Sequence, residues 1–300
     1  MPRAAPKRSL PLNAQTILLV VGVFLLSSIL WAQATRIVLP WQEQPLRVWM
    51  LNVGQGDAFF IEFPTGEQML IDGGRDDALL AKLGSLLLPW DRTIDSILMT
   101  HPDADHVTGF ISLLDRYHID HIYETGAIAT TPQGRMIVER VENEAAIVSL
   151  LSAGDVIEIG EVVLSVVWPQ ETYEGTEVGD RNNTSLVFLL TYGDTSILFT
   201  GDAEEEAEQG FMGDVGNMDV LKVGHHGSLS STSWDLLEIL RPEIALVSAG
   251  EDNPYGHPHP IIMSRLEQWK TAVFRTDFQG DILLTSYGGE PKVQSSPLPF

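Results

Sequence analysis

The sequence has no cysteine and few basic residues. Without cysteine among its 300 residues, disulfides, thiolate metal sites and cysteine nucleophiles are excluded, so any metal ion must bind histidine, carboxylate or amide groups. Only 18 lysine and arginine residues oppose 41 acidic residues, which gives a net charge of −23. This balance disfavours a duplex-binding module, because such modules neutralise phosphates with basic surfaces. A hydrophobic fraction of 44% excludes a disordered acidic chain.

The acidic residues are absent from the first 40 positions. Arg3, Lys7 and Arg8 precede an uncharged, mostly apolar run over residues 16–35. A membrane-spanning helix needs about 20 apolar residues, and basic flanks stay on the cytoplasmic side. We therefore predict a transmembrane or signal helix within 1–35 and a tether over 36–45. Residues 41–300 carry 14 basic and 41 acidic residues, a net −27.

Two alternatives to an uncleaved anchor remain open for this segment. Ala32-Gln33-Ala34 has the small-x-small form of a signal peptidase site, and a buried core helix is the third interpretation. An anchor and a cleaved signal peptide both place the domain beyond this segment outside the cytoplasmic membrane. We expect a single-pass protein with an extracytoplasmic domain, associated with the membrane through its N-terminal helix, or a protein secreted after cleavage near Ala34.

Residues 46–290 have the pattern of one α/β domain, followed by a tail over 291–300. Strand-like segments with turn residues between them occupy 46–71, and a second such series occupies 156–200. Helical patterns follow each series, with one helix predicted over 134–151 and another over 260–271. Two series of strands, each followed by helices, predict two facing sheets with helices outside.

Histidine and aspartate side chains gather just after predicted strands. One strand leads into the loop His101-Pro102-Asp103-Ala104-Asp105-His106, and later strands lead to Asp202, to His225-His226 and to His257. Loops at strand ends are where layered α/β proteins build their sites. A loop can converge ligands on a metal ion, and two ions about 3.5–4 Å apart can share and activate a hydroxide. Each motif alone is weak, whereas the ordered set is specific.

The ordered motifs resemble the metallo-β-lactamase superfamily. The resemblance rests on Asp72-Gly-Gly, the 101–106 loop, Gly201-Asp202 and His225-His226-Gly-Ser. More narrowly, residues 46–290 resemble the exported hydrolase domain of ComEC-type DNA-uptake competence proteins. This narrower likeness rests on the segments 51–57 (LNVGQGD), 182–187 (NNTSLV), 221–228 (LKVGHHGS) and 253–258 (NPYGHP). The implied fold is a four-layer αββα sandwich with its site at the shared edge of the sheets.

The resemblance implies one or two divalent metal ions. One site would use Asp105, His106, Asp202 and His225, and the other His101, Asp103 and Asp202, with Asn183 nearby. Asp103 stands where the superfamily usually has a second histidine, and a further histidine has no counterpart around 182–185. More oxygen ligands favour manganese or magnesium over zinc, and the choice among the three stays open.

Other residues receive supporting roles. The resemblance implies that Asp72 orients the ligand loop. His226 is an alternative ligand to His225 or a substrate contact. Asp105 and His257 are the catalytic candidates, where His257 contacts an oxyanion, protonates a leaving group or is merely structural. Asn183 and Ser185 bind substrate phosphate or cap a hairpin. The acids after Asp202 are interpreted as a helix first turn, because they suit the helix dipole.

Three functions are compatible with these residues. The family resemblance favours an exported phosphodiesterase or nuclease that acts on DNA or another phosphodiester with a metal-activated hydroxide. A DNA-uptake channel is a possible partner, and the oligomeric state stays open. A hydrolase of lactam, lactone or thioester bonds fits the fold but not the narrower motifs. A non-catalytic binding module with an eroded metal site is the third possibility, motivated by the missing histidines.

Overall fold

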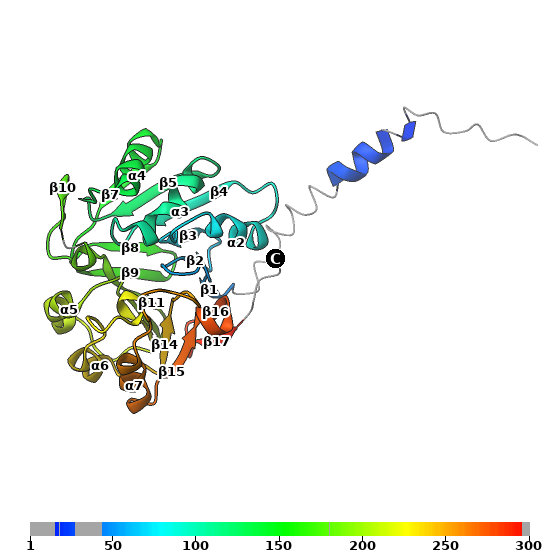
Figure 1. The fold of residues 1–300 in the computed structure, drawn as a ribbon. Coiled ribbons are helices and arrows are strands. Elements are labelled where there is room, and N and C mark those ends of the chain that lie inside the picture. Colours follow the sequence, from blue (N-terminus) through cyan, green and yellow to red (C-terminus); the bar gives the residue numbers. More distant parts are fainter. Residues whose placement is uncertain (1–15, 18, 28–43, 180, 296–300) are drawn as a thin grey trace, which may run out of the picture. The chain divides into compact units, whose positions relative to one another are not determined.

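The computed structural model describes residues 16–17, 19–27, 44–179 and 181–295 (Figure 1). Residues 16–17 and 19–27 are helical, and the other residues of the predicted 1–35 segment lie outside the described part. None of the helices among the described residues is long and apolar enough to span a membrane. One compact unit begins at Gln44, two residues before the predicted start of the domain. Most of the predicted tether also lies outside the described residues.

The first sheet has eight strands. Four of them form an antiparallel series, and the other four run parallel to one another. Their order is β17 (Lys292–Ser295), β16 (Ile282–Ser286), β1 (Leu46–Met50), β2 (Phe59–Glu62), β3 (Gln68–Ile71), β4 (Thr93–Leu98), β5 (His118–Glu124) and β7 (Ile147–Leu150). Strands β3, β4, β5 and β7 run parallel, so their carboxyl ends meet at one edge. In β1 the side chains alternate: Val48 packs between the sheets and Trp49 packs on the opposite face.

The second sheet repeats this plan with seven strands. Their order is β15 (Ala272–Arg275), β14 (Ile244–Val247), β13 (Val220–Lys222), β12 (Thr195–Phe199), β11 (Val187–Tyr192), β9 (Val162–Trp168) and β8 (Val156–Ile159). Strands β12 to β15 run parallel, again with their carboxyl ends at one edge. A small parallel pair joins β6 (Ala127–Ile128) to β10 (Thr176–Glu177).

Helices cover the outer faces of both sheets, while a shared core fills the space between them. The helices are α2 (Ala78–Leu86), α3 (Ala104–Leu114), α4 (Pro132–Asn143), α5 (Glu205–Phe211), α6 (Trp234–Leu240), α7 (Pro260–Gln268) and α8 (Thr276–Gln279). Short 3-10 turns are η1 (Asn182–Thr184), η2 (Met212–Asp214) and η3 (Gly224–Gly227). The inter-sheet core includes Phe59, Phe188 and Phe199. Separate apolar clusters join α2–α4 to the first sheet and α5–α7 to the second.

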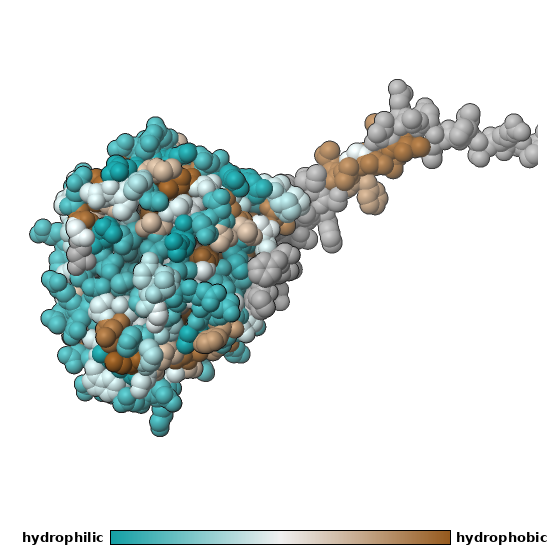
Figure 2. All heavy atoms as spheres, in the orientation of Figure 1, coloured by the Kyte–Doolittle hydropathy of each residue, from teal (hydrophilic) through white to brown (hydrophobic). Residues whose placement is uncertain are grey.

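The α/β class is confirmed, and two predicted boundaries need correction. The helix expected over 134–151 ends at Asn143, and Ile147–Leu150 forms β7 because these residues pair with β5. Part of the predicted tail, Lys292–Ser295, is instead a strand paired with β16. The face of residues 44–295 seen in Figure 2 is mostly hydrophilic, with scattered apolar patches.

Candidate metal centre

The loop between β4 and α3 contributes four of the predicted site residues. His101 and His106 are buried, at 2% and 0% exposure, whereas Asp103 and Asp105 are partly exposed. Asp103 is the residue at the N-cap of α3, and Asp105 and His106 lie in its first turn. His106 lies beside Asp202, which follows β12, and Asp105 lies beside His226, which follows β13, so this segment faces the carboxyl ends of those two strands.

Asp72 joins this loop to the end of β3. Its carboxylate accepts hydrogen bonds from the Thr100 backbone N–H at 2.8 Å and from Thr100 Oγ1 at 2.7 Å. Asp72 Oδ2 also lies 2.8 Å from His106 Nδ1, which leaves His106 Nε2 directed toward Asp202, 3.2 Å from its Oδ2. Asp72 has a left-handed backbone (φ 56°), a conformation that aspartate tolerates better than most residues. This geometry suits the predicted orienting role.

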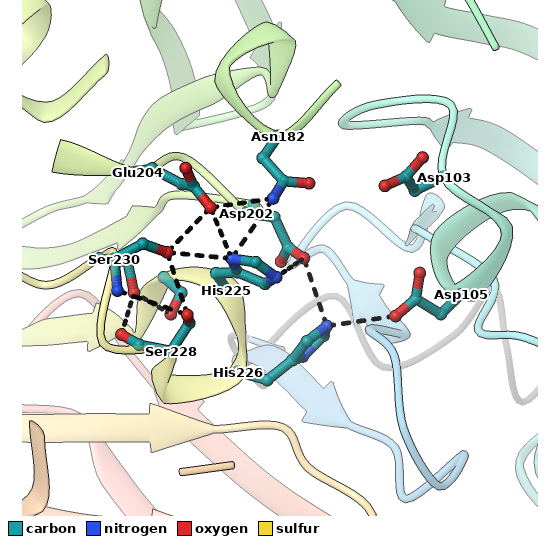
Figure 3. A network of polar contacts seen from close by, with 12 residues as sticks. Asp103, Asp105, Asn182, Asp202, Glu204, His225, His226, Ser228 and Ser230 are labelled. Atoms are coloured by element: carbon teal, nitrogen blue, oxygen red, sulfur yellow. Dashed lines mark hydrogen bonds and ion pairs between the residues drawn. The ribbon is translucent and has the colours of Figure 1, made fainter. Parts of the chain in front are cut away.

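The second sheet supplies the opposite wall of the site (Figure 3). Asp202 follows β12, and its Oδ2 lies 3.4 Å from His226 Nε2 and 3.8 Å from His225 Nε2. His226 Nε2 is also 3.6 Å from Asp105 Oδ2. Both histidines of η3 have left-handed backbone angles, and their ring planes lie at 67° to each other. His226 is buried and points at the aspartates, whereas His225 is partly exposed.

The structure therefore places His226, not the predicted His225, among the convergent groups. Ligand-capable atoms lie within 4.8 Å of one another in His101, His106 and Asp202, in Asp105, His106 and His226, and in two further sets that include Asp57. His225 Nδ1 instead lies 3.1 Å from Glu204 Oε1, which also accepts from Ser230 Oγ. Glu204 therefore contacts the site as well as preceding α5, a role that the helix-dipole interpretation missed.

Two buried charges for which the sequence pattern predicted no role complete the centre. Lys222, the last residue of β13, forms an ion pair with Asp57 and donates to the Gly201 carbonyl at 2.7 Å. Its Nζ lies 3.6 Å from Asp202 Oδ1. Asp57 Oδ1 lies 3.4 Å from His226 Nδ1, which also lies 3.0 Å from the Ser248 carbonyl. Asp57 lies in the 51–57 motif and Lys222 in the 221–228 motif. Their place in these motifs was the sequence signal that could have identified them.

The remaining predicted residues lie around the centre without joining the ligand groups. Ser185 Oγ accepts from the Asp202 backbone N–H at 3.0 Å, and Asn183 Oδ1 accepts from the Glu204 backbone N–H at 3.0 Å. Asp103 pairs with Arg181, and its Oδ2 lies 3.9 Å from His101 Nε2. Through these contacts Ser185 and Asn183 hold the backbone at Asp202 and Glu204.

His257 lies beside the η3 histidines, in the loop after β14. Its ring centroid is 5.5 Å from that of His225 and 6.5 Å from that of His226. Asn253 fixes this loop, because its Oδ1 accepts from the His257 backbone N–H at 2.9 Å and its Nδ2 donates to the His257 carbonyl at 2.7 Å. Burial, followed by the charge of His225, lowers the His257 pKa to about 4. The imidazole of His257 is therefore neutral at neutral pH.

Strong opposite charges control the protonation of the centre. Burial opposes charge on Asp57, but Lys222 and then His226 lower its pKa to about 2. Burial likewise opposes charge on His106 and His226, yet Asp202, followed by Asp72 for His106 and Asp57 for His226, raises their pKa well above the usual range. For His101, burial and then His106 lower the pKa to about 3. The carboxylates around His106 and His226 thus favour positive charge at these two imidazoles.

A divalent metal fits the residues present. The buried Nε2 atoms of His101, His106 and His226 have no hydrogen-bond partner among the described residues, and neither does Asp202 Oδ1. A buried polar atom without a hydrogen bond is costly, so several such atoms in overlapping ligand groups indicate that the residues hold a cation. Imidazole and carboxylate donors together are compatible with zinc or manganese.

The fold and the site together indicate the protein family. The family model of the metallo-beta-lactamase superfamily matches residues 51–251, and the chain therefore belongs to that superfamily. Members are generally metal-dependent hydrolases, in agreement with the convergent histidines and aspartates.

Relatives among curated proteins confirm the resemblance to ComEC-type competence proteins. The chain is 31% identical over 252 residues to ComE operon protein 3 of Bacillus subtilis, covering 78% of this chain and 32% of that protein. It is 30% identical over 257 residues to Recombination protein 2 of Haemophilus influenzae, covering 83% and 30%. Competence protein ComA of Neisseria gonorrhoeae is 26% identical over 258 residues, covering 85% and 34%. The chain spans about a third of the length of these relatives.

Solved structures agree on the fold. The metallo-beta-lactamase fold protein YhfI from Bacillus subtilis superposes with a TM-score of 0.53 at 12% identity, covering 81% of this chain and 100% of that protein. The metal-dependent hydrolase Tm1679 gives a TM-score of 0.51 at 11% identity, covering 84% and 100%. At these identities the likeness establishes the fold alone.

Proposed function

We propose that the chain is an exported, metal-dependent phosphodiesterase that acts on nucleic acid. The observation that carries the hydrolase assignment is a pair of overlapping ligand groups that share His106, one with His101 and Asp202 and the other with Asp105 and His226. The three buried imidazole Nε2 atoms of these groups have no hydrogen-bond partner among the described residues. The phosphodiester assignment draws on the relatives, one of which is named a recombination protein and another a competence protein.

In this proposal, Asp105, His106, Asp202 and His226 hold a divalent ion, and His101 completes the ligand set. When bound, the ion supplies Lewis acidity and lowers the pKa of a water molecule. Asp72 holds the imidazole of His106 in place through Nδ1. His257, neutral at neutral pH and fixed by Asn253, is placed to donate a hydrogen bond to an oxygen that gains charge.

The location and the partner belong to the same proposal. A basic stretch before an apolar segment, together with a strongly acidic domain after it, supports export of the domain with membrane attachment or cleavage near Ala34. The relatives are about three times longer than the matched region. We therefore propose a DNA-uptake channel as a partner, with the hydrolase acting on DNA outside the cytoplasm.

The test compares metals and substrates on the full chain. Metal is removed with a chelator, and manganese, magnesium or zinc is added separately. Substrates are single-stranded DNA, duplex DNA, bis-p-nitrophenyl phosphate and a chromogenic β-lactam. We expect metal-dependent cleavage of the phosphodiesters and a loss of about 100-fold or more in Asp202→Asn and His106→Ala, because a lost metal removes several kcal/mol of transition-state stabilisation.

Asp120→Asn is the matched control, since Asp120 is an exposed aspartate on β5. It should retain full activity. If folded protein cleaves no phosphodiester with any metal, the proposal is wrong. Lactam cleavage alone would transfer the assignment to the alternative hydrolase class, and metal binding without any hydrolysis would favour a binding module.

A further inference from the structure

Asp103 and Arg181 form an ion pair at the edge of the metal centre. The Nε of Arg181 donates to Asp103 Oδ1, and the two residues are 78 positions apart in sequence. Their side chains are 20% and 28% exposed, so the pair is partly protected from solvent. Asp103 comes from the N-cap of α3, and Arg181 immediately precedes η1. The pair therefore joins the two halves of the domain beside the site.

The ion pair with Arg181 occupies the Asp103 carboxylate. One oxygen is engaged by the guanidinium, and the other lies 3.9 Å from His101 Nε2, beyond hydrogen-bond distance. No convergent ligand group among the described residues contains Asp103. Asp103, which was predicted to bind metal, instead forms an ion pair with Arg181.

The backbone around Arg181 is fixed next to the centre. The Arg181 carbonyl accepts from the Thr184 backbone N–H at 3.0 Å and from Thr184 Oγ1 at 2.7 Å. The neighbouring Asn182 side chain donates to Glu204 at 3.1 Å and lies 3.4 Å from His225 Nδ1 (Figure 3). The Asn183 carbonyl accepts from Trp168 Nε1 at 2.8 Å. Arg181 thus belongs to a hydrogen-bonded segment that also contacts His225.

We propose that Arg181 binds an anionic phosphoryl oxygen of the substrate, and that Asp103 positions its guanidinium instead of binding metal. The proposal rests on the phosphodiesterase function above. Guanidinium has five N–H donors in a planar fork that matches phosphate oxygens. Among the described residues, the hydrogen bonds of the Arg181 guanidinium are limited to the Nε contact with Asp103. Carboxylates dominate the centre. The Arg181 guanidinium lies beside Asp103, on the His101 side of the centre, and its positive charge attracts an anion there.

The test measures inorganic phosphate binding to the manganese-loaded full chain by calorimetry. Arg181→Ala should weaken phosphate binding about 10-fold or more, because a charged hydrogen bond contributes about 1.5–3 kcal/mol. Arg181→Lys should bind phosphate with an affinity between those of the unaltered protein and Arg181→Ala. Lysine keeps the positive charge but lacks the planar fork of N–H donors. Manganese affinity should not decrease in either variant. Arg140→Ala, which removes another arginine–aspartate pair, is the matched control and should change nothing.

A double-mutant cycle isolates the role of Asp103. Asp103→Asn should weaken phosphate binding without lowering manganese affinity, and adding it to Arg181→Ala should cause little further loss. A 10–100-fold loss of manganese affinity in Asp103→Asn would overturn the proposal, because it would show that Asp103 binds the metal or supports its ligands instead of only positioning Arg181. Unchanged phosphate binding in Arg181→Ala, or no phosphate binding by the unaltered protein, would overturn it too. These binding results hold whether or not the chain cleaves phosphodiesters, so this failure is distinguishable from failure of the proposed function.

Discussion

A single carboxylate, Asp72, links three groups of the ligand loop. It binds the backbone and hydroxyl of Thr100 and the Nδ1 of His106, while its own exposure is 0%. A carboxylate on one imidazole nitrogen fixes the tautomer and increases the basicity of the other. The left-handed backbone at Asp72 is a local cost that the three contacts offset.

Asp72→Asn should lower manganese affinity about 10–100-fold while every direct ligand remains. Asparagine tolerates the same left-handed backbone and has nearly the same volume, so the change reports on charge and hydrogen bonding. Calorimetric titration of the metal-free chain measures the effect, with Asp120→Asn alongside. Equal affinity in the two variants would show that Asp72 does not act through His106.

Lys222 has a different consequence because its charge is buried among carboxylates. Its 1% exposure leaves Asp57, Asp202 and the Gly201 carbonyl as its surroundings. Burial opposes the charge, but Asp57 and then Asp202 raise the pKa of the lysine, so it stays protonated. The ammonium in turn lowers the pKa of Asp57 and keeps that carboxylate ionised beside the metal ligands.

Lys222→Met should destabilise the metal-free protein by about 3–5 kcal/mol, since removing one partner leaves a buried charge uncompensated. Adding Asp57→Asn should restore part of that loss by removing the lone carboxylate. Urea unfolding measures both, with Lys292→Met on the exposed surface of β17 as the control. A loss no larger than that of the control would contradict the prediction.

At the scale of elements, α3 is positioned by close contact with the loop after β3. The Gly109 N–H donates to the Gly74 carbonyl at 3.1 Å, and a Cβ at Gly109 would stand 2.0 Å from the Gly73 oxygen. Only glycine permits this approach. Because Asp105 and His106 lie in the first turn of α3, the same contact sets where two site residues point.

Gly109→Ala should therefore cost about 1–3 kcal/mol of stability and also weaken manganese binding, because α3 has to move away from the loop. Gly84→Ala in α2 is the matched change, with no atom within 4 Å of the added Cβ. It should stabilise the protein by up to about 1 kcal/mol and leave metal binding unaltered. Urea unfolding and manganese titration are measured on both. The idea fails if the two alanine variants behave alike.

The elements also show what local pattern predicts and what it does not. Strand ends followed by polar loops predicted the region in which the structure brings histidines and aspartates together, because alternation and turn chemistry are local. The end of the 134–151 helix was missed, since Ile147–Leu150 becomes a strand only by pairing with β5. Lys222 and Arg181 were missed because lysine and arginine are usually exposed, and burial or pairing across 78 positions is a tertiary property.

At the scale of the whole molecule, the net negative charge does not favour attraction of nucleic acid. Residues after position 40 carry 41 acidic and 14 basic side chains. Some of this acidity, at Asp57, Asp72, Asp105 and Asp202, belongs to the metal centre, and metal binding offsets part of it. Many of the other acids are exposed, and their charge should repel a polyanion at long range. The proposed phosphate contacts with the metal and Arg181 would act only at short range.

This repulsion predicts an unusual salt dependence. Raising monovalent salt from about 0.01 to about 0.1 M shortens the screening length from about 30 to about 10 Å, so long-range repulsion weakens while contacts at the centre persist. The kcat/KM for a single-stranded oligonucleotide should therefore rise over this range, whereas basic nucleic-acid-binding proteins lose affinity. Bis-p-nitrophenyl phosphate, with one charge, is the control and should respond less. A steep fall with salt for the oligonucleotide would instead reveal a basic track that outweighs the net charge of the domain.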